Sequence, residues 1–154
     1  MTAHLRQLRW RHWALVPGPA DFKEPLYSTE LQGPIAHYDI RGVANATLRI
    51  PGVQLSHAAA PDWWHWAARW TGASGSYISL KMTLFDTDSP FFGGFDLETD
   101  CTPCELLDLW QALRRDFTSL WLHSPDCRLY KPSTFRAEHI GPFVSVCLAG
   151  QRKL

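Results

Sequence analysis

One stretch of the chain alternates cleanly between apolar and more polar residues. Within residues 76–85, every second position from Ile78 onward carries a large apolar side chain: Ile78, Leu80, Met82 and Leu84. Successive side chains of a β-strand point to opposite faces of its sheet, so this period of two predicts a strand with one buried face. The chain must therefore form a sheet and supply other apolar surface to cover it.

A helix is predicted shortly after this strand. Thr102 is a favourable N-cap, Pro103 suits the first helical position, and Glu105 completes a capping box. The apolar residues that follow recur at the spacing of one helix face: Leu106, Leu107, Leu109, Trp110 and Leu113. The pattern predicts a well-capped amphipathic helix from about residue 103 to residue 117.

The segment between these two elements is predicted to turn and return as a second strand. Gly93-Gly94 permits a turn, and Phe95 and Leu97 then alternate with Asp96 and Glu98. This alternation is typical of a half-exposed strand with its carboxylates outward. With the strand at 76–85 it would form an acidic hairpin.

A second, shorter helix is predicted from about residue 62 to residue 71. Asp62 can act as its N-cap, and the following residues fall at helical spacing on one face: Trp63, Trp66, Ala67 and Trp70. Trp64 points away from that face. Because Trp is enriched at binding hot spots, Trp64 is the tryptophan that we expect to anchor a partner.

Weaker patterns complete the expected fold. They predict a turn at 124–126, a helical turn at 132–135, and strands at 5–16, 35–43, 46–55, 119–123 and 143–148. The strands at 35–43 and 46–55 would form a bent hairpin. This order of strands and helices predicts one α+β domain over residues 1–154, with a mainly antiparallel sheet.

Composition narrows the class of protein. With 154 residues and 45% hydrophobic residues, the chain can bury a sizeable core. Fifteen Lys and Arg balance fifteen Asp and Glu, so no net positive charge is available to hold nucleic-acid phosphates. The sequence shows no signal peptide and no run long enough to span a membrane. We therefore expect a cytoplasmic protein that contacts neither nucleic acid nor membrane directly.

The acidic residues are unevenly distributed. Residues 82–113 hold seven of the fifteen carboxylates and neither Lys nor Arg. This asymmetry indicates either a solubilising face or a negative field that steers a basic protein towards the chain. On the second interpretation the partner-binding residues are Trp64 together with six acids: Asp86, Asp88, Asp96, Glu98, Asp100 and Asp108.

Cys101 and Cys104 suggest a different function. A Cys-X-X-Cys at a helix start resembles the redox site of thioredoxin-like proteins, and a helix N-terminus lowers the pKa of a thiol. The strand before it is polar at alternate residues, however, and four nearby acids would oppose thiolate formation. A dithiol oxidoreductase is thus the alternative to a binding protein. The cysteines lack the second close ligand pair of a structural zinc site, and we name no catalytic residue, metal or cofactor.

The chain has the general character of a known class of small inhibitor proteins. Three features contribute to this: the acidic cluster, the small size and the absence of a catalytic set. The chain resembles the cytoplasmic immunity proteins of bacterial contact-dependent inhibition and related polymorphic toxin systems. The resemblance implies a non-enzymatic inhibitor that covers a toxin domain, often a nuclease with a basic substrate-binding face. The third interpretation is a structural or scaffolding domain without a partner at this face.

Overall fold

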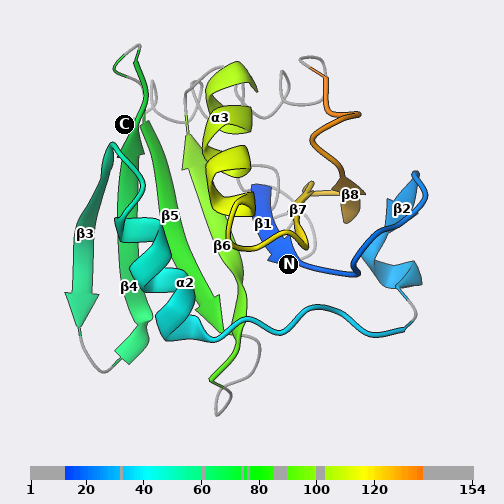
Figure 1. The fold of residues 1–154 in the computed structure, drawn as a ribbon, viewed down its shortest axis with the longest axis horizontal. Coiled ribbons are helices and arrows are strands. Elements are labelled where there is room, and N and C mark those ends of the chain that lie inside the picture. Colours follow the sequence, from blue (N-terminus) through cyan, green and yellow to red (C-terminus); the bar gives the residue numbers. More distant parts are fainter. Residues whose placement is uncertain are drawn as a thin grey trace, which may run out of the picture.

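The computed structural model, drawn in Figure 1, describes residues 13–31, 33–59, 62–73, 75, 77–84, 90–99 and 103–136. Its strands are β1 Trp13–Pro17, β2 Leu26–Tyr27, β3 Val53–Ala59, β4 Asp62–Thr71, β5 Tyr77–Leu84, β6 Phe92–Thr99, β7 Leu120–His123 and β8 Arg128–Tyr130. Its helices are a short 3-10 helix η1 Ser28–Glu30, α2 Ile40–Leu48 and α3 Pro103–Arg114.

The strands form one eight-stranded sheet in the order β2-β8-β7-β1-β6-β5-β4-β3. Each pair of neighbouring strands is antiparallel. The helices α2 and α3 lie on one face of the sheet (Figure 1) and contribute to the same buried cluster. The prediction of an α+β fold with a mainly antiparallel sheet is confirmed.

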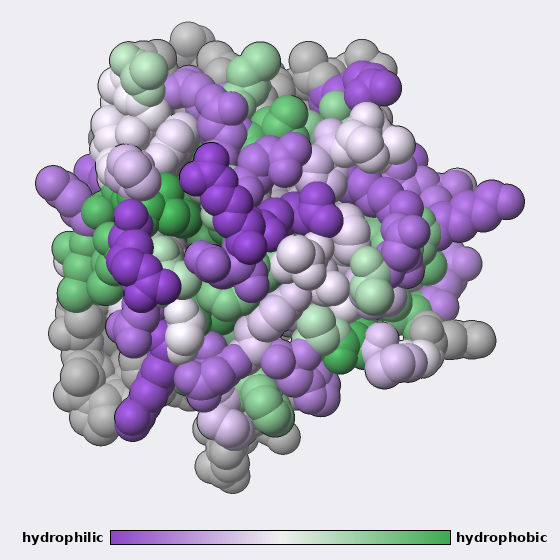
Figure 2. All heavy atoms as spheres, viewed as in Figure 1, coloured by the Kyte–Doolittle hydropathy of each residue, from purple (hydrophilic) through white to green (hydrophobic). Residues whose placement is uncertain are grey.

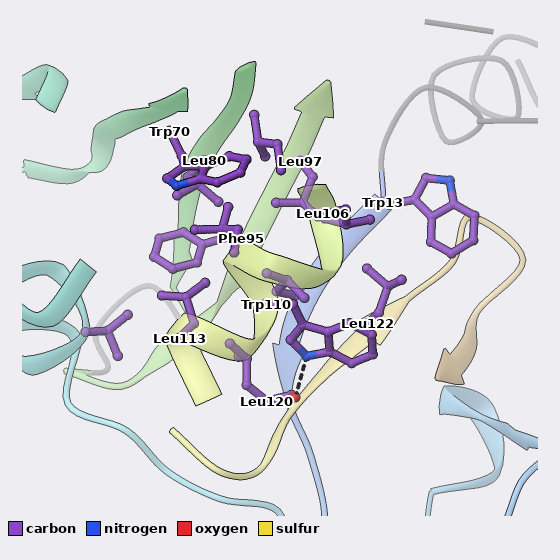
Figure 3. Close-up of a cluster of buried hydrophobic side chains, with 14 of the residues drawn as sticks. Trp13, Trp70, Leu80, Phe95, Leu97, Leu106, Trp110, Leu113, Leu120 and Leu122 are labelled. Carbon is purple, nitrogen blue, oxygen red and sulfur yellow. Dashed lines mark hydrogen bonds between the residues drawn. The ribbon is translucent and has the colours of Figure 1, made fainter. Parts of the chain in front are cut away.

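The core lies between α3 and the middle of the sheet (Figure 3). Phe95 and Leu97 of β6 point towards the helix, where they meet Leu106, Trp110 and Leu113. The indole N–H of Trp110 donates to the carbonyl oxygen of Leu120 at 2.9 Å. Trp110 is the largest of the fully buried side chains, and this bond satisfies its polar end.

Elements with strong local signals are confirmed. The strand predicted at 76–85 is β5, and its Ile78, Leu80 and Met82 are buried as expected. The helix predicted at 103–117 is α3, which ends at Arg114. The strand at 119–123 is β7, and the turn after it is closed by a hydrogen bond from the Ser124 hydroxyl to the Asp126 carboxylate.

Other predictions are met in part or lie outside the described residues. The strand predicted at 5–16 overlaps β1 from Trp13, and residues 5–12 are outside the described part of the chain. The helical turn at 132–135 appears as a turn in which the Phe135 N–H donates to the Lys131 carbonyl at 3.0 Å. The strand at 143–148 is outside the described residues as well.

The tryptophan-rich helix predicted at 62–71 is wrong, because this segment is strand β4. Trp66, Ala68 and Trp70 are buried, whereas Arg69 between them is exposed. That is a period of two. The segment forms a strand because it pairs with β3 on one side and with β5 on the other. Aromatic side chains are also common on the half-buried surface of a sheet.

The hairpin predicted from 35–43 and 46–55 is also wrong. Residues 40–48 form helix α2, whose N-cap Asp39 accepts a hydrogen bond from the Gly42 N–H at 3.1 Å. Four of its five buried residues recur at the spacing of one helix face: Ile40, Val43, Ala44 and Thr47. The Asp39 cap and this spacing determine a helix. Strand β3 begins only at Val53, after the turn that contains Gly52.

Gly93-Gly94 does not form the predicted turn, because both residues lie inside β6. The pairing of β5 with β6 shifts between Thr83 and Leu84, so the glycines mark a β-bulge. At Gly94 φ is 145°, and an added Cβ would lie 3.0 Å from the Leu15 carbonyl oxygen of β1. A side chain at this position would meet both backbone strain and a neighbouring strand.

We predict that Gly94→Ala lowers the free energy of unfolding by about 3 kcal/mol or more, since strain and overlap add. Gly33→Ala is the control: φ there is also positive, at 91°, but nothing lies within 4 Å. The control is expected to cost only about 1 kcal/mol. Urea denaturation of both variants measures the difference, and equal losses would contradict the close approach of β6 to β1.

Replacing Trp110 tests the bond between α3 and β7. In Trp110→Phe the Leu120 carbonyl loses its donor, and leaving a buried acceptor unsatisfied costs about 1–3 kcal/mol. Part of the core volume is lost as well. Thermal unfolding followed by circular dichroism should show a clearly lower transition temperature. A transition unchanged from that of the parent would show that the indole hydrogen bond does not hold the helix.

Candidate partner-binding surface

Strand β6 carries two of the predicted partner-binding carboxylates. It lies near the middle of the sheet, between β1 and β5. Because Phe95 and Leu97 face α3, the alternating residues Asp96 and Glu98 project from the opposite face of the sheet, and both are exposed. The expectation of an outward acidic strand paired with β5 is thus confirmed for these two residues.

Basic residues lie beside these carboxylates. In the sheet register Asp96 is directly opposite Lys81 of β5, and Cβ atoms of directly opposed residues are about 4.5–5.5 Å apart. Glu98 is opposite Ser79, and Ser79 is opposite Arg69 of β4. Lys81 and Arg69 are exposed on the same face. This surface is therefore a patterned mixture of charges and not a uniformly negative field.

These basic neighbours are not visible in the sequence pattern, for a definable reason. Lys81 falls one residue before the acidic segment, and Arg69 is far from it along the chain. Only the strand pairing brings both next to the carboxylates. Arg69 is also oriented by stacking, because its guanidinium carbon lies 4.2 Å from the ring centroid of Tyr77. Alternation within β5 already indicated that Lys81 points away from the core.

Asp108 does not share this surface. It is exposed on α3, and that helix packs on the face of the sheet opposite Asp96 and Glu98. The sheet and a helix about 10 Å across separate it from the β6 carboxylates. At physiological ionic strength, charges separated by more than a Debye length of about 8 Å are largely screened from one another. Asp108 thus belongs to a different side of the molecule.

The remaining predicted residues are outside the described part of the structure. This applies to Asp86, Asp88 and Asp100, and to the side chain of Trp64, of which only the backbone is described, within β4. Their place on a binding surface stays a prediction.

Of the two cysteines predicted for the alternative function, only Cys104 lies within the described part of the structure. Cys104 is exposed in the first turn of α3, and Cys101 is outside the described residues. The strand before them, β6, has one exposed face and two antiparallel neighbours. Dithiol chemistry stays a prediction. Within the described ranges, no group of three or more His, Cys, Asp or Glu residues is arranged to hold a metal ion.

A second polar cluster lies near β8. The Lys131 ammonium is 2.6 Å from the Asp21 carboxylate and 5.0 Å from the ring centroid of Phe22, which packs edge-on against Trp121. The hydrogen bond from Lys131 lowers the pKa of Asp21, and so do the Phe22 N–H and the positive charge of Lys131. Burial raises the pKa of Tyr130 in the adjoining strand. The cluster fastens the segment after β1 to the segment after β8.

We predict that an NMR titration finds the pKa of Asp21 below its ordinary value, and that Lys131→Met raises it towards that value. A lowered pKa in the folded state adds stability above the ordinary pKa, and this stability is lost as pH falls through the lowered value. In Lys131→Met, the free energy of unfolding should therefore fall less as the pH is lowered through the acidic range. An identical Asp21 titration in both proteins would contradict the ion pair.

No family model, no curated protein and no solved structure matches the chain. Among the described residues, no helix is long and apolar enough to cross a bilayer.

Proposed function

We propose that the chain is a non-enzymatic, inhibitor-type binding protein that covers a basic protein partner with the exposed face of its sheet. The partner that fits this hypothesis best is a toxin domain, as for the immunity proteins that the sequence resembles. The observation that carries the proposal is the outward position of Asp96 and Glu98 on a central strand.

Rigidity supports a binding role for these carboxylates. Residues two apart on a strand lie about 6.5–7 Å from each other along it. Strand β6 is bonded on both sides and backed by the core, so binding need not order its backbone. Two fixed acids can therefore meet two basic groups of a partner at low entropic cost.

The basic neighbours add selectivity. Lys81 and Arg69 would repel a partner that is uniformly basic where it meets β4 and β5. They favour a partner whose basic groups lie over β6 and whose acidic or aromatic groups lie over the adjoining strands. Such a charge pattern affects the association rate and the register of binding more than the total affinity.

The proposal predicts a slower association when the β6 charges are reversed. The wild-type chain, used as bait in its source cells, should capture a basic protein that mass spectrometry identifies. Asp96→Lys combined with Glu98→Lys should then lower the association rate constant by about tenfold or more and flatten its salt dependence. Surface plasmon resonance at several salt concentrations measures both quantities.

Asp108→Lys combined with Asp116→Lys is the matched control, because it makes the same change of charge at exposed positions of α3 and the turn after it. This control should associate nearly as fast as the wild type. If both double variants slow association equally, only net charge matters and the sheet face is not the interface. If the captured protein is acidic, the proposed partner class is wrong.

A further inference from the structure

Arg69 and Tyr77 form a pair on the exposed face of the sheet, the face that carries Asp96 and Glu98. Arg69 of β4 is directly opposite Ser79 of β5, so Tyr77, two residues before Ser79, is its diagonal neighbour. Diagonal side chains of an antiparallel pair are within reach of each other when they are aromatic or long. The guanidinium carbon of Arg69 lies 4.2 Å from the ring centroid of Tyr77, so the guanidinium is stacked on the ring.

This stack gives the guanidinium a fixed place. Strand β4 pairs with β3 on one side and with β5 on the other (Figure 1), so the backbone beneath Arg69 is held on both sides. Tyr77 holds the far end of the same side chain. Ordering a long side chain is one of the costs of forming an interface, and for Arg69 part of this ordering is already present in the unbound protein.

The stack leaves the hydrogen-bonding edge of Arg69 open. The ring of Tyr77 covers one side of the planar guanidinium, whereas the N–H donors point outward within its plane. Within the described part of the chain, no hydrogen bond or ion pair joins the Arg69 side chain to another residue. Polar side chains also gather on the helix-covered side of the molecule, which Figure 2 shows, so exposure alone does not distinguish Arg69. Its fixed position does, together with those donors.

The charges around Arg69 favour an anionic group. The described outward side chains of β4 and β5 include no acid: Ala67, Arg69, Thr71, Tyr77, Ser79, Lys81 and Thr83. Lys81 is the other diagonal neighbour of Arg69 and lies directly opposite Asp96. Arg69 is farther from the β6 acids, because Glu98 lies two strands away, about 9–10 Å between the backbones. This exceeds a Debye length of about 8 Å, so the charge of Arg69 is only weakly offset.

We propose that Arg69 fixes the register of the partner on the sheet by binding the carboxylate of one Asp or Glu of that partner. The guanidinium would donate two parallel N–H bonds to the carboxylate, the bidentate geometry that suits its planar shape. Tyr77 is a positioning residue, because it acts by orienting the guanidinium. This role rests on the function proposed above, since it requires the partner to cover the same face of the sheet.

The two kinds of charge on this face then act on different steps of binding. Attraction between the β6 acids and a basic partner mainly affects the association rate, whereas a close, hydrogen-bonded charge pair mainly affects the dissociation rate. If Arg69 only repelled the basic partner, removing its charge would strengthen binding. If Arg69 binds a carboxylate, removing its charge weakens binding. The sign of the change therefore separates the two roles.

Arg69→Gln tests the assignment against the captured partner by surface plasmon resonance. The dissociation rate constant should rise by about tenfold or more. The association rate constant should stay the same or rise slightly, because one repulsive positive charge is gone. Arg115→Gln removes the same charge at an exposed position directly after α3 and should leave the dissociation rate constant unchanged. Thermal unfolding followed by circular dichroism should show the same transition temperature for both variants and the wild type.

Two substitutions of Tyr77 test the positioning role. Tyr77→Leu removes the ring and should raise the dissociation rate constant by about threefold or more, whereas Tyr77→Phe keeps the ring and should dissociate as the wild type does. Tyr77→Leu combined with Arg69→Gln should dissociate no faster than Arg69→Gln alone, because the ring acts through the guanidinium. A wild-type dissociation rate for Tyr77→Leu would overturn this role.

One acid of the partner should couple to Arg69. When each exposed Asp and Glu of the captured partner is replaced by its amide, one replacement should raise the dissociation rate constant as Arg69→Gln does and have no further effect in that variant. The assignment is overturned if no partner acid behaves in this way, or if Arg69→Gln leaves dissociation unchanged or slows it. If Asp96→Lys combined with Glu98→Lys still slows association, only the Arg69 contact is wrong. If that double variant also has no effect, the sheet face is not the interface.

Discussion

The packing of α3 against the sheet is the constraint on which the rest of the structure depends. Trp110 inserts its ring into the core and uses its N–H to bond the Leu120 carbonyl, so a single side chain ties the helix to β7. Leu106 and Leu113 on either side of it cover Phe95 and Leu97 of β6. This contact fixes which face of β6 is buried. A slip of one residue would turn both carboxylates into the core, at a prohibitive cost in desolvation.

Elements that depend on local sequence signals can be predicted, whereas elements that depend on distant strands cannot. In β5 and α3 the period of the apolar residues agrees with the fold, so short windows suffice to predict them. The segment at 62–71 satisfies helical spacing as well as alternation, and its choice of strand depends on β3 and β5, which lie elsewhere in the chain. In α2, Gly42 and the β-branched residues weaken the helical signal, which only the Asp39 cap restores.

The candidate surface was likewise predictable only where it depends on local alternation. Alternation places Asp96 and Glu98 outward, and the structure agrees. Strand order was needed to bring Lys81 and Arg69 beside them, and the packing of α3 sets Asp108 on the other side of the sheet.

The proposed binding role can be examined most directly by labelling the carboxylates. Carbodiimide coupling followed by mass spectrometry reports which acids remain accessible when the captured partner is bound. Binding through the sheet face requires that Asp96 and Glu98 lose their labelling in the complex while Asp108 on α3 keeps it. Equal labelling of Asp96 and Glu98 in the free and bound protein would contradict the role of this surface.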